Sequence, residues 1–249
     1  MRDTIGYGLL GVLAWTAVGC ASPRGVAPTP PERVLAERYG FSGWGEIESI
    51  RYTFNVELPG RDEPIVRGWQ WQTKTGEVER VTRRNEYDLD VMIFNLNKKQ
   101  DLKVGEQNQA HQQFINDSYW LLFPFQLVWS NPTVTEAGLR PLPIGEGTGR
   151  KLTAQWPAEG GYTPGDAYDL YLGGDGLIRD WVFRRGGAEG GGRAATWEDH
   201  RQLGPIVVSL EHRGPAPGSG ESGFRLWFTG VEATLADGTV VAAGAMGGE

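Results

Sequence analysis

The stretch that decides the fold is EQNQAHQQFINDSYWLLFPFQLVW, residues 106–129, because its pattern is helical while strand patterns dominate on both sides. Residues 106–120 place apolar side chains at helical spacing among many glutamines, which is typical of a polar amphipathic helix. Residues 119–129 form the most apolar segment outside the N-terminal region. Pro124 interrupts it, and proline removes a helical hydrogen bond and restricts its predecessor. The helix should therefore kink or stop at Phe123.

The segments before this helix alternate apolar and polar residues, which is the period of a half-buried strand. Residues 50–58 (IRYTFNVEL) alternate throughout, and residues 65–72 (IVRGWQWQ) place both tryptophans on one face. Further strands are predicted at 78–81 and 87–93, each after a turn. Because short turns join antiparallel neighbours, the first half of the chain is predicted to be a β-meander.

The segments after the helix return to the strand pattern. A loop is predicted first, over residues 136–150, because prolines and glycines gather there. The run GGDG at 173–176 is a strong hairpin turn. The strands expected in this half are residues 152–156, 167–172, 177–184, 197–202, 206–212, 224–235 and 239–241.

The N-terminus has the layout of a secretory signal peptide over residues 1–19. Arg2 precedes an apolar run at 5–18, which is too short to span a bilayer as a helix. Small residues then lead to Cys20, the only cysteine of the chain. We interpret this as a lipobox-like site at which Cys20 receives a lipid, palmitate being a typical acyl group. The alternative is an ordinary signal peptide with an incidental Cys20.

The region after the signal divides into a tether and a domain. Residues 20–31 combine the lipidated cysteine with a proline-rich, extended tether. Residues 32–249 form the domain, which opens with a short helix at 32–39. Ala21 stands where an aspartate would favour inner-membrane retention, so we expect an outer-membrane anchor facing the periplasm. Two or three acyl chains hold such a protein stably.

Composition excludes several classes of function. The net charge of −7 gives no general attraction for nucleic acid or anionic headgroups. With Cys20 acylated, no thiol remains for a disulfide or a zinc site. Thirty-seven glycines indicate many turns, and ten tryptophans indicate a large aromatic interior or a lined cavity. We expect a monomer that uses no cofactor and no metal.

Three short motifs carry a family resemblance: INDSYWLLFPF at 115–125, YDLYL at 168–172 and GLI at 176–178. Together with one helix between two blocks of strands, they resemble an uncharacterised family of bacterial lipoproteins with the LolA/LolB-like lipoprotein-carrier fold. The resemblance covers residues 45–235. It implies a mainly β (α+β) fold, in which one strongly curved antiparallel sheet forms an unclosed β-barrel covered by helices. It also implies a hydrophobic cavity for acyl chains and no catalysis.

Large aromatic side chains are the candidate ligand-binding surface, because they bury much area with few rotamers to freeze. The candidates for the cavity or its lid are Trp69, Trp71, Trp120, Phe123, Phe125, Trp129, Trp156, Tyr168, Trp181, Phe183 and Trp227. The alternative is a plain aromatic core. Residues 119–129 are in addition a candidate lid, or else a buried helix that plugs the barrel.

The proline-rich run at 139–144 is a candidate loop for contact with a membrane or a partner, through Leu139, Leu142 and Ile144. The alternative is that this loop packs back on its own domain.

Enzymatic interpretations have weak support. His111, His200 and His212 show no metal-binding spacing, and consecutive residues such as 198–200 face opposite sides of a strand. The glycine-rich run at 145–151 lacks phosphate-loop spacing. We therefore predict an anchored, non-catalytic lipoprotein that binds a lipid or a lipoprotein acyl chain. The alternative is a structural or interaction lipoprotein of the envelope with a solid core.

Overall fold

The computed structural model describes residues 28–246 apart from 84–88, 99–104, 191 and 216–222. The predicted signal peptide and the lipidation site at Cys20 lie outside the described residues. Within those residues, no helix is both long and apolar enough to cross a membrane.

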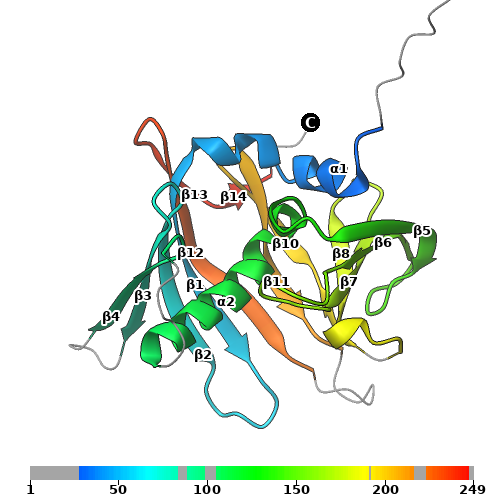
Figure 1. Ribbon diagram of the computed structural model, residues 1–249, viewed down its shortest axis with the longest axis horizontal. Helices are drawn as coiled ribbons and strands as arrows, with labels where there is room; N and C mark the ends of the chain where they lie inside the picture. The colour runs from blue at the N-terminus through cyan, green and yellow to red at the C-terminus, as the bar shows by residue number, and fades with distance from the viewer. Residues whose placement is uncertain (1–27, 84–88, 99–104, 191, 216–222, 247–249) are drawn as a thin grey trace, which may run out of the picture.

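Antiparallel strands in two sheets dominate the described part of the chain (Figure 1). The larger sheet has the order β14 (Gly244–Ala245), β10 (Glu198–Leu203), β11 (Ile206–Arg213), β12 (Arg225–Leu235), β1 (Ile47–Glu57), β2 (Ile65–Gln72), β3 (Glu77–Arg83) and β4 (Leu89–Asn95), and β13 (Val240–Ala242) pairs with β12. The smaller sheet has the order β5 (Thr133–Pro141), β6 (Thr148–Gln155), β7 (Ala167–Leu172), β8 (Ile178–Arg184) and β9 (Arg193–Thr196). A short 3-10 turn, η2 (Arg185–Gly187), follows β8.

The two sheets meet along β9 and β11. Trp197 alone separates β9 from β10, so the chain passes directly from one sheet into the other. The Trp197 N–H donates to the Arg179 carbonyl at 2.6 Å, and Thr196 O lies 3.1 Å from His212 Nδ1 on β11. On the far sides, β4 and β5 are the outermost strands of the two sheets in the part of the chain that the structure describes. The expected curved, unclosed antiparallel wall is confirmed, and its hydrogen bonds divide it into two sheets rather than one.

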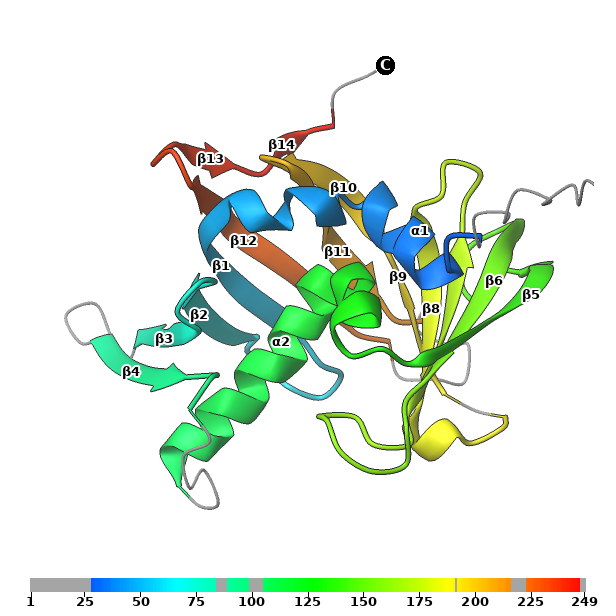
Figure 2. The same cartoon turned by 45° about the horizontal axis from the view of Figure 1, so that its top comes forward.

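The central helix α2 (Glu106–Trp129) lies in the hollow between the sheets (Figure 2). The expected kink is confirmed: Leu122 departs from helical geometry (φ −123°, ψ 24°), two residues before Pro124. The helix then continues to Trp129 instead of stopping. The prediction of a break was therefore right about its place, and tertiary packing carries the helix past it.

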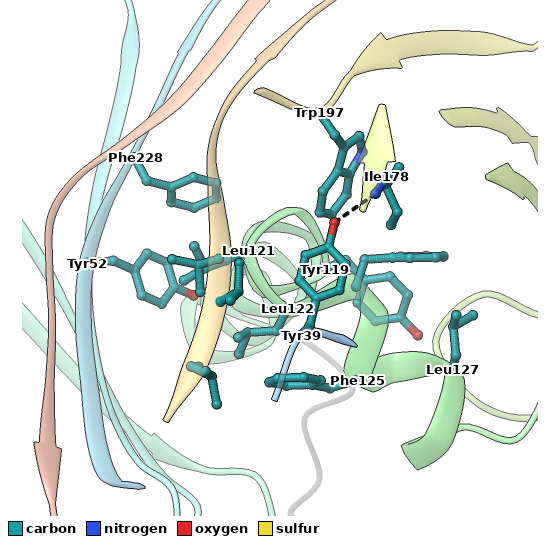
Figure 3. Close-up of a cluster of buried hydrophobic side chains, with 14 of the residues drawn as sticks. Tyr39, Tyr52, Tyr119, Leu121, Leu122, Phe125, Leu127, Ile178, Trp197 and Phe228 are labelled. Carbon is teal, nitrogen blue, oxygen red and sulfur yellow. Dashed lines mark hydrogen bonds between the residues drawn. The ribbon is translucent and has the colours of Figure 1, made fainter. Parts of the chain in front are cut away.

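The second half of α2 is core, not surface. Phe123 is fully buried, and its ring lies 4.8 Å from that of Tyr168 and 5.0 Å from that of Trp181. Figure 3 shows Leu121, Leu122 and Phe125 among buried side chains from both sheets. This burial favours the plugging helix over the lid for residues 121–127.

Helix α1 (Pro31–Arg38) and the 3-10 helix η1 (Phe41–Glu46) cover one end of the hollow (Figure 1). The Ile178 N–H donates to the Tyr39 hydroxyl at 3.0 Å, as Figure 3 shows, and the Val207 N–H donates to the Tyr39 carbonyl at 2.9 Å. Gly40 has φ +84°, and a Cβ there would collide with the Pro205 carbonyl oxygen. These contacts fix α1 against both sheets.

Two predicted features differ in the structure. The predicted loop at 136–150 contains most of β5, which was missed because a Pro and a Gly lie within it. Gly138 (φ +69°) sits in a bulge and Pro141 on an outermost strand, which are the places where strands accept these residues. Strand β4 was expected, but its apolar residues Leu89, Val91 and Ile93 face solvent, whereas Phe94 is buried.

Candidate ligand cavity

A cavity of about 610 Å³ lies between α2 and the concave faces of both sheets. Its apolar lining comes from β1, α2, β7, β8, β12 and the residues next to the ends of β1 and β12: Phe54, Val56, Leu58, Ile115, Trp120, Tyr168, Trp181, Phe183, Phe224 and Leu226. Its polar lining comes mainly from α2 and the loop between β6 and β7: Arg67, Gln112, Asn116, Tyr119, Tyr162, Thr163, Asp166 and Arg193. The site is thus an aromatic hollow with a polar mouth.

Strand alternation explains the apolar wall. Phe54 and Val56 lie two residues apart on β1 and therefore share its inner face. Leu226 pairs with Val56 across the β1–β12 ladder, and Phe183 pairs with Tyr168 across β7–β8. Each pair brings two apolar side chains together on the concave side.

A buried ion pair fixes α2 to the cavity wall. Arg67 Nε and Nη2 donate to Asp117 Oδ2 and Oδ1 at 2.7 and 2.6 Å, and Trp69 Nε1 donates to Oδ2 at 2.8 Å. The Arg67 guanidinium also lies 4.6 Å from the centre of the Phe54 ring. Asp117 is fully buried, and burial raises its pKa while Arg67 opposes that effect. The Arg67 charge is therefore matched within the protein.

The three histidines lie in three different places in the structure. His111 Nε2 is 3.3 Å from the Tyr162 hydroxyl, beside the cavity mouth. His200 Nε2 is 3.0 Å from the Tyr39 hydroxyl, under α1. His212 is fully buried among Trp120, Trp197 and Phe228. Each histidine therefore has its own structural surroundings.

The eleven aromatic residues predicted as ligand-binding divide into three groups. Four line the cavity: Trp120, Tyr168, Trp181 and Phe183. Six lie outside the cavity lining and pack against other aromatic rings: Trp69, Trp71, Phe123, Phe125, Trp129 and Trp156. Of these six, Trp129 is 39 % exposed and the other five belong to the core or pack against it. Ligand binding by the first group stays a prediction.

Trp227 lies on the outer face of β12, which corrects its expected place in the interior. Leu226 and Phe228 on either side are buried inward, so strand alternation turns Trp227 outward. The Arg225 guanidinium lies 4.3 Å from the centre of its ring.

Several lining residues were missed from the sequence. Phe54 and Leu226 could have been found, because the alternation in their strands places them on the inner face. Tyr162, Asp166 and Arg193 carry no such signal, since they lie in a loop and at a strand start.

The predicted membrane or partner loop is partly folded back. Leu139 is 67 % exposed but belongs to β5 rather than to a loop. Leu142 and Ile144 are half-buried, and the Ile144 N–H donates to the buried Asp180 carboxylate at 2.8 Å. Contact with a membrane or partner stays a prediction, and only Leu139 is well exposed for it.

Comparison with known proteins gives only distant likenesses. No protein-family model and no curated protein matches the sequence. Three solved structures are similar over 82 % of this chain: a DUF1329 family protein from Desulfovibrio piger (12 % identity, 93 % of that chain, TM-score 0.42), a LolA superfamily protein from Nitrosomonas europaea (8 %, 93 %, 0.42), and an outer membrane lipoprotein-sorting protein domain from Vibrio parahaemolyticus (9 %, 90 %, 0.44). At these TM-scores the likeness is slight, and the proposals below rest on the geometry of the chain itself.

Proposed function

We propose that this protein is an extracytoplasmic lipoprotein that binds a hydrophobic ligand, a lipid or a lipoprotein acyl chain, without catalysis. The observation that carries the proposal is the cavity of about 610 Å³. Ligand pockets of about 300–1,000 Å³ with an apolar lining and a few polar groups are typical of small-molecule sites.

The driving force of binding would be the release of water from aromatic surface. Trp120 and Trp181 lie with ring centres 4.4 Å apart on one side of the cavity, and Phe54 faces it from β1. An acyl chain bound there gains about 25 cal/mol of favourable free energy for each Å² of apolar surface that is removed from water. The polar side chains at the mouth would keep the ligand's head in water.

The anchor belongs to the same proposal. Cys20 would carry the acyl groups, and residues 21–30 would link it to α1, which begins at Pro31. Ten extended residues reach at most about 35 Å. The domain would therefore stay close to the outer membrane, on its periplasmic side.

Lipid analysis tests the binding proposal. The mature chain of residues 21–249, which lacks the signal peptide and Cys20, is purified without detergent and extracted with organic solvent before mass spectrometry. We expect stoichiometric lipid from the native protein and a sharply lower amount from a sample unfolded and washed first. A folded protein that is empty and ignores added fatty acyl probes would contradict the proposal.

A second candidate, an interaction lipoprotein, has one specific observation in its favour. Strand β4 is a sheet edge, and its outward residues Leu89, Val91 and Ile93 are 49–56 % exposed. Exposed apolar edge strands are sites of pairing with other chains. An empty cavity in the lipid analysis would favour the interaction lipoprotein, so that experiment separates the two candidate functions.

A further inference from the structure

Two charged side chains that line the cavity, unlike that of Arg67, are not held in a bidentate ion pair with another side chain in the described part of the protein. The charged lining residues of the cavity are Arg67, Arg193 and Asp166. Arg67 is held in the bidentate pair with Asp117. The charges that remain for a ligand are the guanidinium of Arg193 and the carboxylate of Asp166.

Arg193 opens β9 and is exposed at the cavity mouth. Among the residues that the structure describes, none forms a hydrogen bond or an ion pair with its guanidinium. Guanidinium groups bind phosphate and carboxylate through paired N–H donors. An anionic group of the ligand can therefore be held here.

Asp166 lies at the end of the loop between β6 and β7, and one carboxylate oxygen accepts the Gly186 N–H at 2.8 Å. Tyr119, Tyr162 and Tyr168 line the same cavity. Burial is the main cause that raises the pKa of Tyr119 and of Tyr168, and the Asp166 charge adds to the rise in both. A site lined by aromatic rings and a carboxylate favours the binding of an ammonium group.

The two charges lie at the same end of the smaller sheet. Arg193 pairs with Phe183, and Asp166 directly precedes Ala167, which pairs with Arg184. Strands β7 and β9 flank β8, so neighbouring strands about 4.8 Å apart put the two backbones about 10 Å apart. Both side chains face the cavity between them, at a separation that a head group with an anion and a cation can bridge.

The volume suits one apolar chain. A site of about 610 Å³ lies within the usual range of small-molecule pockets, about 300–1,000 Å³. A single long chain with its head group is a ligand of that size.

We propose that the cavity takes a single-chain amphiphile with a zwitterionic head, its anionic group on Arg193 and its ammonium group between Asp166 and the tyrosines. This inference rests on the proposed function, because it names the chemistry of the ligand in the same cavity.

Isothermal titration calorimetry on the mature chain of residues 21–249 tests it, with probes that share a dodecyl chain and differ in the head. Dodecylphosphocholine is zwitterionic, dodecanoate anionic, dodecyltrimethylammonium cationic and dodecyl maltoside neutral, each below its micellar concentration. We expect the zwitterionic probe to bind tightest. A triacylated lipopeptide should not displace it, and displacement would overturn the single-chain part of the inference.

Two variants assign the head group. Arg193→Gln should weaken dodecylphosphocholine and dodecanoate by about fivefold, the loss of a partly exposed ion pair, and leave the cationic probe unchanged. Asp166→Asn, which keeps an oxygen for the Gly186 N–H, should weaken the zwitterionic and cationic probes by about as much. Arg185→Gln and Glu189→Gln, which are exposed and outside the cavity lining, are the matched controls and should change nothing.

The outcomes separate the two proposals. Equal affinity for all four heads in the unsubstituted cavity would overturn the zwitterionic inference and leave the hydrophobic-ligand proposal standing. No binding of any probe would overturn both. Because the head preference is measured first with both charged residues in place, the test does not depend on the folding of the variants.

Discussion

At the scale of single residues, the pair of Arg67 and Asp117 is the most consequential contact of the cavity wall. Both groups are withdrawn from water, with side-chain exposures of 14 % and 0 %. Burying two charges is offset only when their geometry is good and their remaining hydrogen bonds are made. Here the fork of Arg67 and the indole of Trp69 satisfy both carboxylate oxygens.

Asp117→Ala should therefore destabilise the domain by about 3–5 kcal/mol, because it leaves the Arg67 charge buried without a partner. Urea unfolding followed by circular dichroism measures the change. The matched control is Glu232→Ala, which breaks the exposed pair with Arg51 and should cost no more than about 1 kcal/mol. Equal costs for the two variants would show that the buried pair is not a stabilising contact.

Buried histidines predict a loss of stability in acid. Burial lowers the pKa of His212 to about 3 and is the main cause that lowers that of His200 to about 4. Because these values lie below the ordinary 6.5, the unfolded chain binds more protons than the fold below that pH. The contribution to stability is fully present above pH 6.5 and is lost as the pH falls toward 3.

His212→Asn, which keeps a donor for the Thr196 carbonyl, removes one of these titrations. The free energy of unfolding of the unsubstituted chain should fall more steeply between pH 6.5 and 4 than that of the variant. His111→Asn is the comparison: burial lowers the pKa of that half-buried histidine as well, so this variant should change the slope in the same direction but by less. Parallel pH curves for His212→Asn and the unsubstituted chain would refute a buried neutral imidazole.

At the scale of elements, the position of α1 depends on one glycine. Gly40 combines φ +84° with contact against the Pro205 carbonyl in the β10–β11 turn. Gly40→Ala should cost more than about 1 kcal/mol, because strain and collision act together. Gly60→Ala is the control: φ is +76° there but the space is open, so only strain applies. Thermal unfolding of both variants gives the comparison, and a smaller loss at Gly40 than at Gly60 would rule out the close contact.

The helices and strands show how much of the fold can be predicted from sequence patterns. The alternation of β1 and β2 and the helical period of residues 106–129 predicted these elements correctly, because each follows from one buried face. Strand β5 was missed because Gly138 and Pro141 resemble loop residues unless the edge and the bulge are known. In β4 the faces could not be predicted, since Leu89, Val91 and Ile93 are as apolar as Met92 and Phe94, which pack against the core.

The cavity was only partly predictable for a related reason. Large aromatics in a sequence show that a core or a cavity exists, but not which side chains border the empty space. Trp156 and Trp181 were equal candidates, and only the second lines the cavity. The mouth residues Tyr162, Asp166 and Arg193 come together through sheet register and the conformation of a loop, which no local pattern records.

At the scale of the whole molecule, truncating a core side chain and truncating a cavity side chain should have different effects on stability and on ligand binding. Trp69 is 1 % exposed and bonded to Asp117, so Trp69→Ala should cost about 3–5 kcal/mol and unfold a marginal domain. Phe183 is half-buried beside the cavity, so Phe183→Ala should cost less and weaken binding of an acyl probe. Denaturant unfolding and probe titration on both variants check this contrast. The same stability loss with unchanged binding for Phe183→Ala would count against its place in the site.

If the cavity holds a hydrophobic ligand, a larger side chain that fills the cavity should prevent binding. Ile115 is half-buried on α2 and lines the cavity, so Ile115→Trp should occupy the space of the ligand. Val240→Trp, at a position 62 % exposed and outside the cavity lining, is the matched control. The measurement is titration of a fluorescent fatty acyl probe into both variants, with thermal unfolding to confirm the fold. We predict that Ile115→Trp binds the probe about tenfold more weakly, while the control binds it with unchanged affinity. Unchanged binding in a folded Ile115→Trp protein would contradict the account.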